Sequence, residues 1–344
     1  MGICSSSEPE DVFTKHTMEL STHGKIATAV VTGGSSHLDG SQYRDLEKMR
    51  VIKASKILII GDNRIKVATA CYISAWVAAN GQDVEVIVGT RDPDAAKNSL
   101  LIKNGVRMIK ADMNSPGSLL PAIRDSKADT VFLVSPNRLD RSAQTTSGIS
   151  ACRRAGVGHV VVLSSTCVER KEPSIFGDQC KHIEAFMKTT RLSYTIIRIP
   201  ILIDNYLSQL QSMSEYGIFY RPLPPNAKRN SIAISDVGAA VGTILLTPGL
   251  YADKTISLNG PFTDCETAAA AFTIAFQKPV IYEQVSYESY RDTLLEASLP
   301  DWQVNGILEL FKMYERQEPF CQGSLKVCNC VMMMTRVASN CQLL

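Results

Sequence analysis

The chain has 344 residues, 45% of them hydrophobic and 20% charged, so it can bury a sizeable core and is neither disordered nor collagen-like. Its 36 Lys and Arg against 34 Asp and Glu give a net charge of +2, which argues against direct binding to nucleic acid. The apolar runs from Ile57 and Val131 are far shorter than the roughly 20 residues of a membrane helix.

The chain carries ten cysteines, and it begins without the apolar stretch of a secretory signal peptide. We therefore expect reduced thiols in a cytoplasmic protein. Cys328 and Cys330 form a CxC pair that has neither a second pair nor a neighbouring histidine, so the spacing predicts no metal site.

Residues 1–55 form a Ser-, Thr- and Gly-rich N-terminal extension that we expect to be flexible, and residues 56–205 follow with a regular alternation. Strands are expected at 57–60, 84–88, 106–109, 130–134, 159–163 and 194–197, and helices at 64–79, 94–104, 115–125, 143–155 and 179–189. Strands that alternate with helices of this length predict right-handed crossovers and an α/β fold with a doubly wound, Rossmann-like parallel sheet.

A smaller α/β C-terminal region is expected over 206–320, followed by a tail at 321–344. Its predicted strands are 231–234, 255–258 and 280–284, and its helices are 237–246, 264–276 and those within 287–317. Open α/β sheets bind ligands at the carboxyl ends of their strands, so this region is expected to pack there and to contact a substrate or a partner.

The first predicted strand of the sheet is followed by an incomplete glycine motif. A dinucleotide loop needs three glycines for its turn, for the approach of the pyrophosphate and for helix packing. Here only Gly61 is present, with Arg64 and Val67 in the other two places. A competing cluster at 33–36 is followed by neither a continuous apolar-faced helix nor a second strand, so we place the motif at Gly61.

An arginine follows the second predicted strand. Arg91 lies 30 residues after Gly61, at a position where a carboxylate would bind the ribose of NAD. A guanidinium suits a 2′-phosphate instead, so Arg91 favours NADP(H) over NAD. A solvated loop arginine is the alternative.

Further short motifs occur in a fixed order along 56–317. They are Thr90–Pro93, Ala111-Asp112, Val131–Pro136, Val161–Ser165, Tyr194–Pro200, Asp204-Asn205, Ser235–Gly238, Leu258–Pro261, Val280–Tyr287 and Leu299–Trp302. Together they resemble the NmrA-like proteins, atypical short-chain dehydrogenases that bind NADP or NAD. The resemblance implies that the phosphates contact Gly61, Asn63, Arg64 and Ile65, that Arg91 binds the 2′-phosphate, that Asp112 flanks the adenine and that Ser135 lies near the nicotinamide.

The sequence departs from the YxxxK pair with which short-chain dehydrogenases move a proton. Aligning on Glu184 puts Phe176 in the place of the tyrosine and Cys180 in the place of the lysine. Lys181 is a weak catalytic candidate, and a surface lysine at a helix start is the alternative. Cys180 and His182 are two residues apart and would not face each other on a helix, so they form no thiolate–imidazolium couple.

Both ends of the chain match lipidation motifs. Met1–Ser6 fits the signal for myristoylation of Gly2, beside which Cys4 is a candidate for palmitoylation, and Cys341 begins a CaaX-like end. If used, these motifs would attach the protein to the cytoplasmic face of a membrane. Chance matches are the alternative.

Three functions follow from these observations. The first is an NADP(H)-binding regulatory or redox-sensing protein that lacks the catalytic pair and signals to a protein partner. The second is an NAD(P)H-dependent oxidoreductase that acts on a quinone or a related carbonyl. The third is a pseudo-enzyme that has lost the cofactor and serves as an interaction domain.

Overall fold

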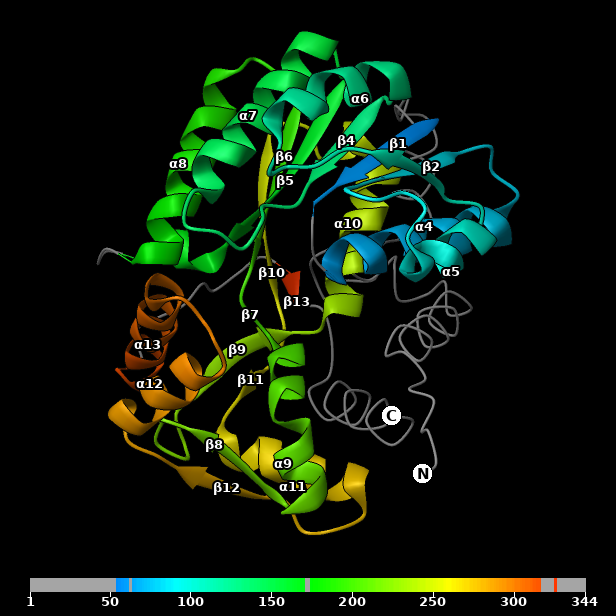
Figure 1. Ribbon diagram of the computed structural model, residues 1–344. Helices are drawn as coiled ribbons and strands as arrows, with labels where there is room; N and C mark the ends of the chain where they lie inside the picture. Colours follow the sequence, from blue (N-terminus) through cyan, green and yellow to red (C-terminus); the bar gives the residue numbers. More distant parts are fainter. Residues whose placement is uncertain (1–53, 62–63, 171–173, 317–324, 327–344) are drawn as a thin grey trace, which may run out of the picture.

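A computed structural model describes residues 54–61, 64–170, 174–316 and 325–326. Its main feature is an eight-stranded sheet in which every neighbouring pair is parallel (Figure 1). In spatial order the strands are β13 (Leu325–Lys326), β10 (Lys254–Asn259), β6 (Tyr194–Ile199), β5 (His159–Ser165), β4 (Thr130–Leu133), β1 (Lys56–Ile60), β2 (Glu85–Thr90) and β3 (Arg107–Lys110). The order 3-2-1-4-5-6 confirms the predicted Rossmann-like fold.

Helices cover both faces of this sheet. One face carries α4 (Arg64–Asn80), α5 (Ser99–Lys103) and α10 (Ile234–Leu246), and the other carries α6 (Leu119–Ser126), α7 (Arg141–Ala155) and α8 (Ile175–Thr189) (Figure 1). Strand β1 shows why its sequence is continuously apolar: Ile57 and Ile59 belong to one core, and Leu58 and Ile60 to the other.

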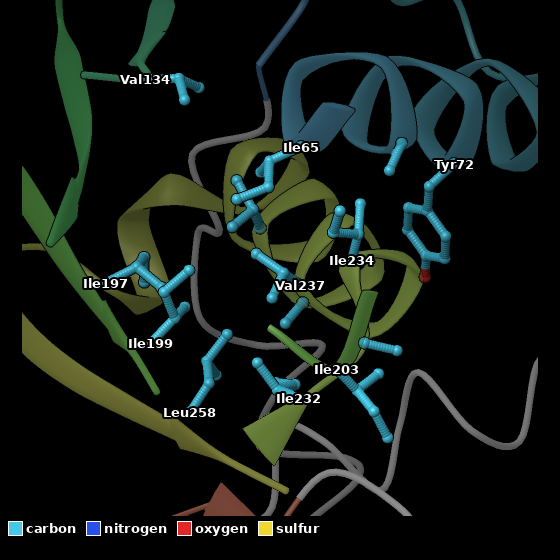
Figure 2. Packing of buried hydrophobic residues seen from close by; sticks show 14 of the residues in the cluster. Ile65, Tyr72, Val134, Ile197, Ile199, Ile203, Ile232, Ile234, Val237 and Leu258 are labelled. Atoms are coloured by element: carbon cyan, nitrogen blue, oxygen red, sulfur yellow. The ribbon is translucent and has the colours of Figure 1, made fainter. Parts of the chain in front are cut away.

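Helix α10 packs closely on α4 through two glycines spaced four residues apart. A Cβ on Gly238 would lie 2.8 Å from the Ala68 Cβ, and a Cβ on Gly242 would lie 2.4 Å from the Tyr72 ring. The Tyr72 hydroxyl is 3.3 Å from the Thr243 hydroxyl. Figure 2 shows the same core extending from α4 and α10 to the apolar ends of β6 and β10.

The smaller region contains two further sheets. One has the order β11 (Phe262–Thr263), β9 (Arg229–Ile232) and β7 (Ile201–Leu202), and the other pairs β12 (Ile281–Gln284) with β8 (Ile218–Arg221). The helices of this region are α9 (Leu210–Glu215), α11 (Cys265–Phe276), α12 (Tyr287–Glu296) and α13 (Asp301–Glu315). The chain crosses between the two regions more than once, because α10 and β10 lie in the large sheet and its covering layer.

Two expected helices differ from the structure in instructive ways. The segment expected as a helix over 94–104 is split into a 3₁₀ helix, Ala96–Asn98, and the short α5. Helix α8 begins at Ile175, four residues earlier than predicted, because the Ser174 hydroxyl accepts a hydrogen bond from the Gly177 N–H at 3.0 Å and caps it.

Candidate functional site

Four of the residues singled out in the sequence lie at the carboxyl ends of neighbouring strands in the large sheet. Gly61 follows β1, Arg91 follows β2, Asp112 follows β3 and Ser135 follows β4, and these strands are neighbours in the order β3-β2-β1-β4. Because the strands are parallel, their carboxyl ends meet at the same edge, which is where doubly wound sheets bind ligands. The structure therefore brings these four positions to the edge that a dinucleotide would use.

Gly61 is required by a close approach between neighbouring strands. Its φ is +153°, and a Cβ there would lie 2.5 Å from the Val134 Cβ and 2.6 Å from the Val134 carbonyl oxygen at the end of β4. No side chain fits at this distance, so the first glycine of the motif keeps its structural role. Asn63 lies outside the described residues.

The residues that replace the second and third glycines of the motif lie in α4. Arg64 is its first residue and is exposed, Ile65 is buried, and Val67 is half-buried against the core that α4 shares with α10. The first turn of α4 contains no acidic residue. An exposed cation at the amino end of a helix fits an anionic group such as a diphosphate.

Lys66 is a further cation in this turn that the sequence analysis did not single out. It is only 9% exposed, and its Nζ lies 3.4 Å from the Gly89 carbonyl oxygen near the end of β2. Arg91 is exposed two residues beyond Gly89. Arg64, Lys66 and Arg91 thus place three cations near the ends of β1 and β2, and this donor set fits a phosphorylated dinucleotide.

Asp112 and Ser135 are both engaged in local hydrogen bonds. An Asp112 carboxylate oxygen accepts from the Asn114 N–H at 2.9 Å, and the Asp112 N–H donates to the Ser118 hydroxyl at 3.1 Å. The Ser135 hydroxyl accepts from the Thr145 hydroxyl at 2.9 Å. These bonds orient both side chains at the sheet edge.

The place of the catalytic pair is filled by packing residues. Phe176, Cys180 and Glu184 repeat every four residues and share one side of α8. The Phe176 ring packs edge-on against Trp302 of α13, with centroids 6.2 Å apart, and closely against Gly306. Cys180 is buried, and burial raises the pKa of its thiol.

Lys181 does not lie on the side of α8 that carries Phe176 and Cys180. Its Nζ is 3.4 Å from a carboxylate oxygen of Asp178 and 3.5 Å from the Arg170 carbonyl oxygen, and its side chain is 39% exposed. His182 is exposed whereas Cys180 is buried, so the two lie on different sides of α8. The structure brings neither Lys181 nor His182 together with Phe176 and Cys180.

Glu184, one turn after Cys180 on α8, is the buried carboxylate of an ion-pair network. Arg198 of β6 makes a bidentate pair with Glu184, at 2.9 Å and 2.7 Å, and bonds Glu169 at 2.8 Å. The Ser164 hydroxyl donates to Glu184 at 2.6 Å. Hydrogen bonding to Glu184 holds the pKa of Arg198 above its usual value, and Glu169 adds to this effect. The network ties α8 to β5 and β6.

Asp204 is a second buried carboxylate near the sheet edge, and its structural role was not predicted. One of its oxygens accepts from the Ile234 N–H at 2.9 Å, at the start of α10. Burial raises the pKa of Asp204, while this hydrogen bond and the charge of Arg64 act in the opposite direction. Asp204 thus anchors α10 close to the first turn of α4.

The described residues hold no group of three or more His, Cys, Asp or Glu side chains that could bind a metal ion. Within the same ranges, no helix combines the length and the apolar character needed to cross a membrane. The lipidation candidates Gly2, Cys4 and Cys341 lie outside the described residues.

The sheet order and the glycine turn at its carboxyl edge define an NAD(P)-binding fold of the Rossmann type. Within that class, the sequence profile of the NmrA-like family matches residues 55–331, and the chain belongs to this family.

Several known proteins are similar to this chain. An NAD(P)H azoreductase of Xenophilus azovorans is 26% identical over 222 residues, covering 64% of this chain and 76% of the azoreductase. Quinone oxidoreductase 2 of Escherichia coli (strain K12) is 25% identical over 221 residues, covering 63% and 74%. The structure of Citrobacter sp. triphenylmethane reductase complexed with NADP(H) shares the fold, with a TM-score of 0.66 at 20% identity over 82% of this chain and 98% of the reductase.

Proposed function

We propose that the protein is an NADP(H)-dependent reductase of a conjugated acceptor, with a quinone as the model substrate. The observation that carries this proposal is the clustering of Gly61, Arg91, Asp112 and Ser135 at the ends of four neighbouring strands. The azoreductase and quinone oxidoreductase names of two relatives support the same class of reaction.

In this proposal each residue at the carboxyl ends of the strands contacts a different part of NADP(H). The first turn of α4, with Arg64 and Lys66, binds the diphosphate, and Arg91 binds the 2′-phosphate. Asp112 flanks the adenine, and Ser135 orients the nicotinamide end through its bond with Thr145. NADPH supplies a hydride when bound.

The replacement of the tyrosine by Phe176 restricts the acceptor. Reduction of a simple ketone produces a strongly basic alkoxide, so it needs a positioned acid. Reduction of a quinone by a hydride produces a weakly basic hydroquinone anion that takes its proton from water. A site without the tyrosine therefore suits a quinone or a similarly conjugated acceptor.

A regulatory role is the second candidate, and it is favoured by the same substitutions. With Phe176 and Cys180 in place of the catalytic pair, the protein would bind NADP(H) without turnover and present a cofactor-dependent surface to a partner. Binding with no oxidation of NADPH by any quinone would support this candidate over the reductase.

The binding test is a titration of the purified protein with NADPH and with NADH. We expect tighter binding of NADPH, and Arg91→Ala should weaken it by roughly 10- to 100-fold while leaving NADH nearly unchanged. Arg107→Ala is the matched control, because Arg107 lies at the amino end of β3 and pairs with Glu85 at 2.6 Å. A folded protein that binds neither nucleotide would contradict the proposal and favour the cofactor-free alternative.

A further inference from the structure

Arg141, the first residue of α7, carries a charge that no carboxylate of the described residues neutralises through an ion pair. Its Nε is buried and has no hydrogen-bond partner. Among the described residues, its guanidinium forms no ion pair either. The nearby carboxylates are committed elsewhere, since Asp140 pairs with Arg138 and Glu184 pairs with Arg198. A partly buried cation without an anion costs stability, so its position needs another explanation.

Helix stability does not provide that explanation. A cation at the amino end of a helix opposes the helix dipole. The main-chain N–H of Arg141 donates to the Arg138 carbonyl at 3.2 Å, which a residue of any type would do. The side chain is therefore not required to start α7.

The guanidinium lies over the ring that replaces the catalytic tyrosine. Its Cζ is 5.4 Å from the centroid of the Phe176 ring, which Trp302 and Gly306 hold from the side of α13. This cation–π contact compensates part of the charge. It leaves the N–H groups at the rim of the guanidinium available for an oxygen ligand.

The charge of Arg141 also reaches the place of the missing lysine. Burial raises the pKa of the thiols of Cys167 and Cys180, and the positive charge of Arg141 acts against that rise at both. On its other side, the Thr145 hydroxyl lies 2.8 Å from the Arg141 carbonyl oxygen and 2.9 Å from the Ser135 hydroxyl. Arg141 thus stands between the end of β4, the end of β5 and α8.

We propose that Arg141 binds an oxygen of the electron acceptor and favours acceptors that carry an anionic oxygen on the conjugated ring, such as hydroxyquinones. This inference rests on the proposed reductase function. In this step the C–H bond of the dihydronicotinamide would break and the hydride would form a new bond to the quinone, which gives NADP⁺ and the hydroquinone monoanion. Water then supplies the one proton that completes the hydroquinone and leaves as hydroxide. Arg141 stabilises the negative charge on the oxygen through charge-assisted hydrogen bonds.

The test compares two naphthoquinones that differ in charge. At neutral pH, 2-hydroxy-1,4-naphthoquinone is an anion and 1,4-naphthoquinone is neutral. Binding of each is measured with and without saturating NADP⁺, from the fluorescence of Trp302, which packs on Phe176 beside the site. A Trp76→Phe background removes the only other tryptophan of the chain.

We expect Arg141→Met to weaken binding of the hydroxyquinone by roughly 10- to 100-fold and binding of the neutral quinone by less than about threefold. Arg141→Lys should restore part of the affinity, because it keeps the charge but loses the planar fork. Arg154→Met, which removes an exposed arginine from the other end of α7, is the matched control.

Unchanged binding of the hydroxyquinone to Arg141→Met would overturn the proposal, as would an equal loss for both quinones, which indicates lost packing alone. NADPH affinity is measured on the same samples and should stay within about twofold of wild type. If no variant binds NADPH, the reductase function fails, and the difference between the two quinones still decides the role of Arg141.

Discussion

Two arginines beside α8 show how differently this fold treats a charge. Arg198 has carboxylates on two sides and joins α8 to the sheet, whereas Arg141 has a buried Nε without a partner and rests on an aromatic ring. A buried ion pair that is fully hydrogen-bonded maintains the structure. A partly buried cation without an anion is more easily understood as a binding group, and this contrast separates the framework of the site from its working surface.

The largest effect is expected from breaking the paired arginine. Arg198→Met leaves Glu184 buried without its cation, and we expect a loss of about 3–5 kcal/mol in the free energy of unfolding measured with urea. Arg141→Met breaks no ion pair, so its loss should stay under about 1 kcal/mol.

If Arg198→Met does not fold, Arg198→Lys provides the comparison, because it keeps the charge and loses the bidentate geometry. Equal destabilisation by Arg141→Met and the Arg198 variants would show that the two arginines play the same structural part.

The next effect comes from a buried group that the fold keeps neutral. His159 at the start of β5 lies 2.9 Å from both the Ser193 and Thr195 hydroxyls, and burial lowers its pKa from 6.5 to about 4. Below pH 6.5 the unfolded chain binds a proton at His159, whereas the folded chain leaves His159 neutral until the pH approaches 4. The contribution of His159 is therefore complete above pH 6.5 and is lost as the pH falls toward 4.

This loss should be on the order of 3 kcal/mol in the free energy of unfolding. His159→Gln, which cannot titrate, should reduce the dependence of stability on pH in this window, and the exposed His182→Gln should leave it unchanged. NADPH affinity should be the same in both variants, because His159 lies at the amino end of its strand. A pH profile of His159→Gln identical to that of wild type would contradict the assignment.

The smallest change in stability is expected from a variant that displaces the Phe176 ring, on which the Arg141 guanidinium rests. A Cβ on Gly306 would lie 2.8 Å from the Phe176 ring, so Gly306→Ala must displace the ring or α13. We expect a loss of about 1–3 kcal/mol in stability and a higher KM for the hydroxyquinone. Gly117→Ala, where the added methyl meets no atom within 4 Å, is the control. A KM unchanged by Gly306→Ala would show that the ring does not position the guanidinium.

Periodicity predicted six of the eight strands of the large sheet as parts of one sheet, because most of them are short and rich in β-branched residues, as at Ile57–Ile60. Strand β10 was predicted as a strand but assigned to the smaller region, and β13 lies in the predicted tail. The smaller region was harder to predict. Strands β7 and β11 have only two residues each, and β8 is followed by a proline-rich stretch, so neither length nor alternation marks them.

The candidate site was predictable only in part. Gly61, Arg91, Asp112 and Ser135 lie within two residues of the ends of neighbouring strands, so the topology alone brings them together. Lys66 and Arg141 lie within or at the start of helices. The significance of Lys66 depends on its burial, and that of Arg141 depends on a buried Nε without a hydrogen-bond partner. The one available signal for Arg141 was its place in the first helical turn after the Ser135 loop, and that signal does not distinguish it from a surface arginine.

Oxidation of NADPH by a quinone in the presence of the purified protein tests the central claim most directly. The account predicts that the protein accelerates the loss of the near-ultraviolet absorbance of NADPH, with saturation at lower concentrations of NADPH than of NADH. Hydroquinone should form in equal amount, and Arg141→Met should slow the reaction with hydroxyquinones most. Tight NADPH binding with no turnover of any quinone would contradict the reductase and leave the cofactor-sensing protein as the account of this chain.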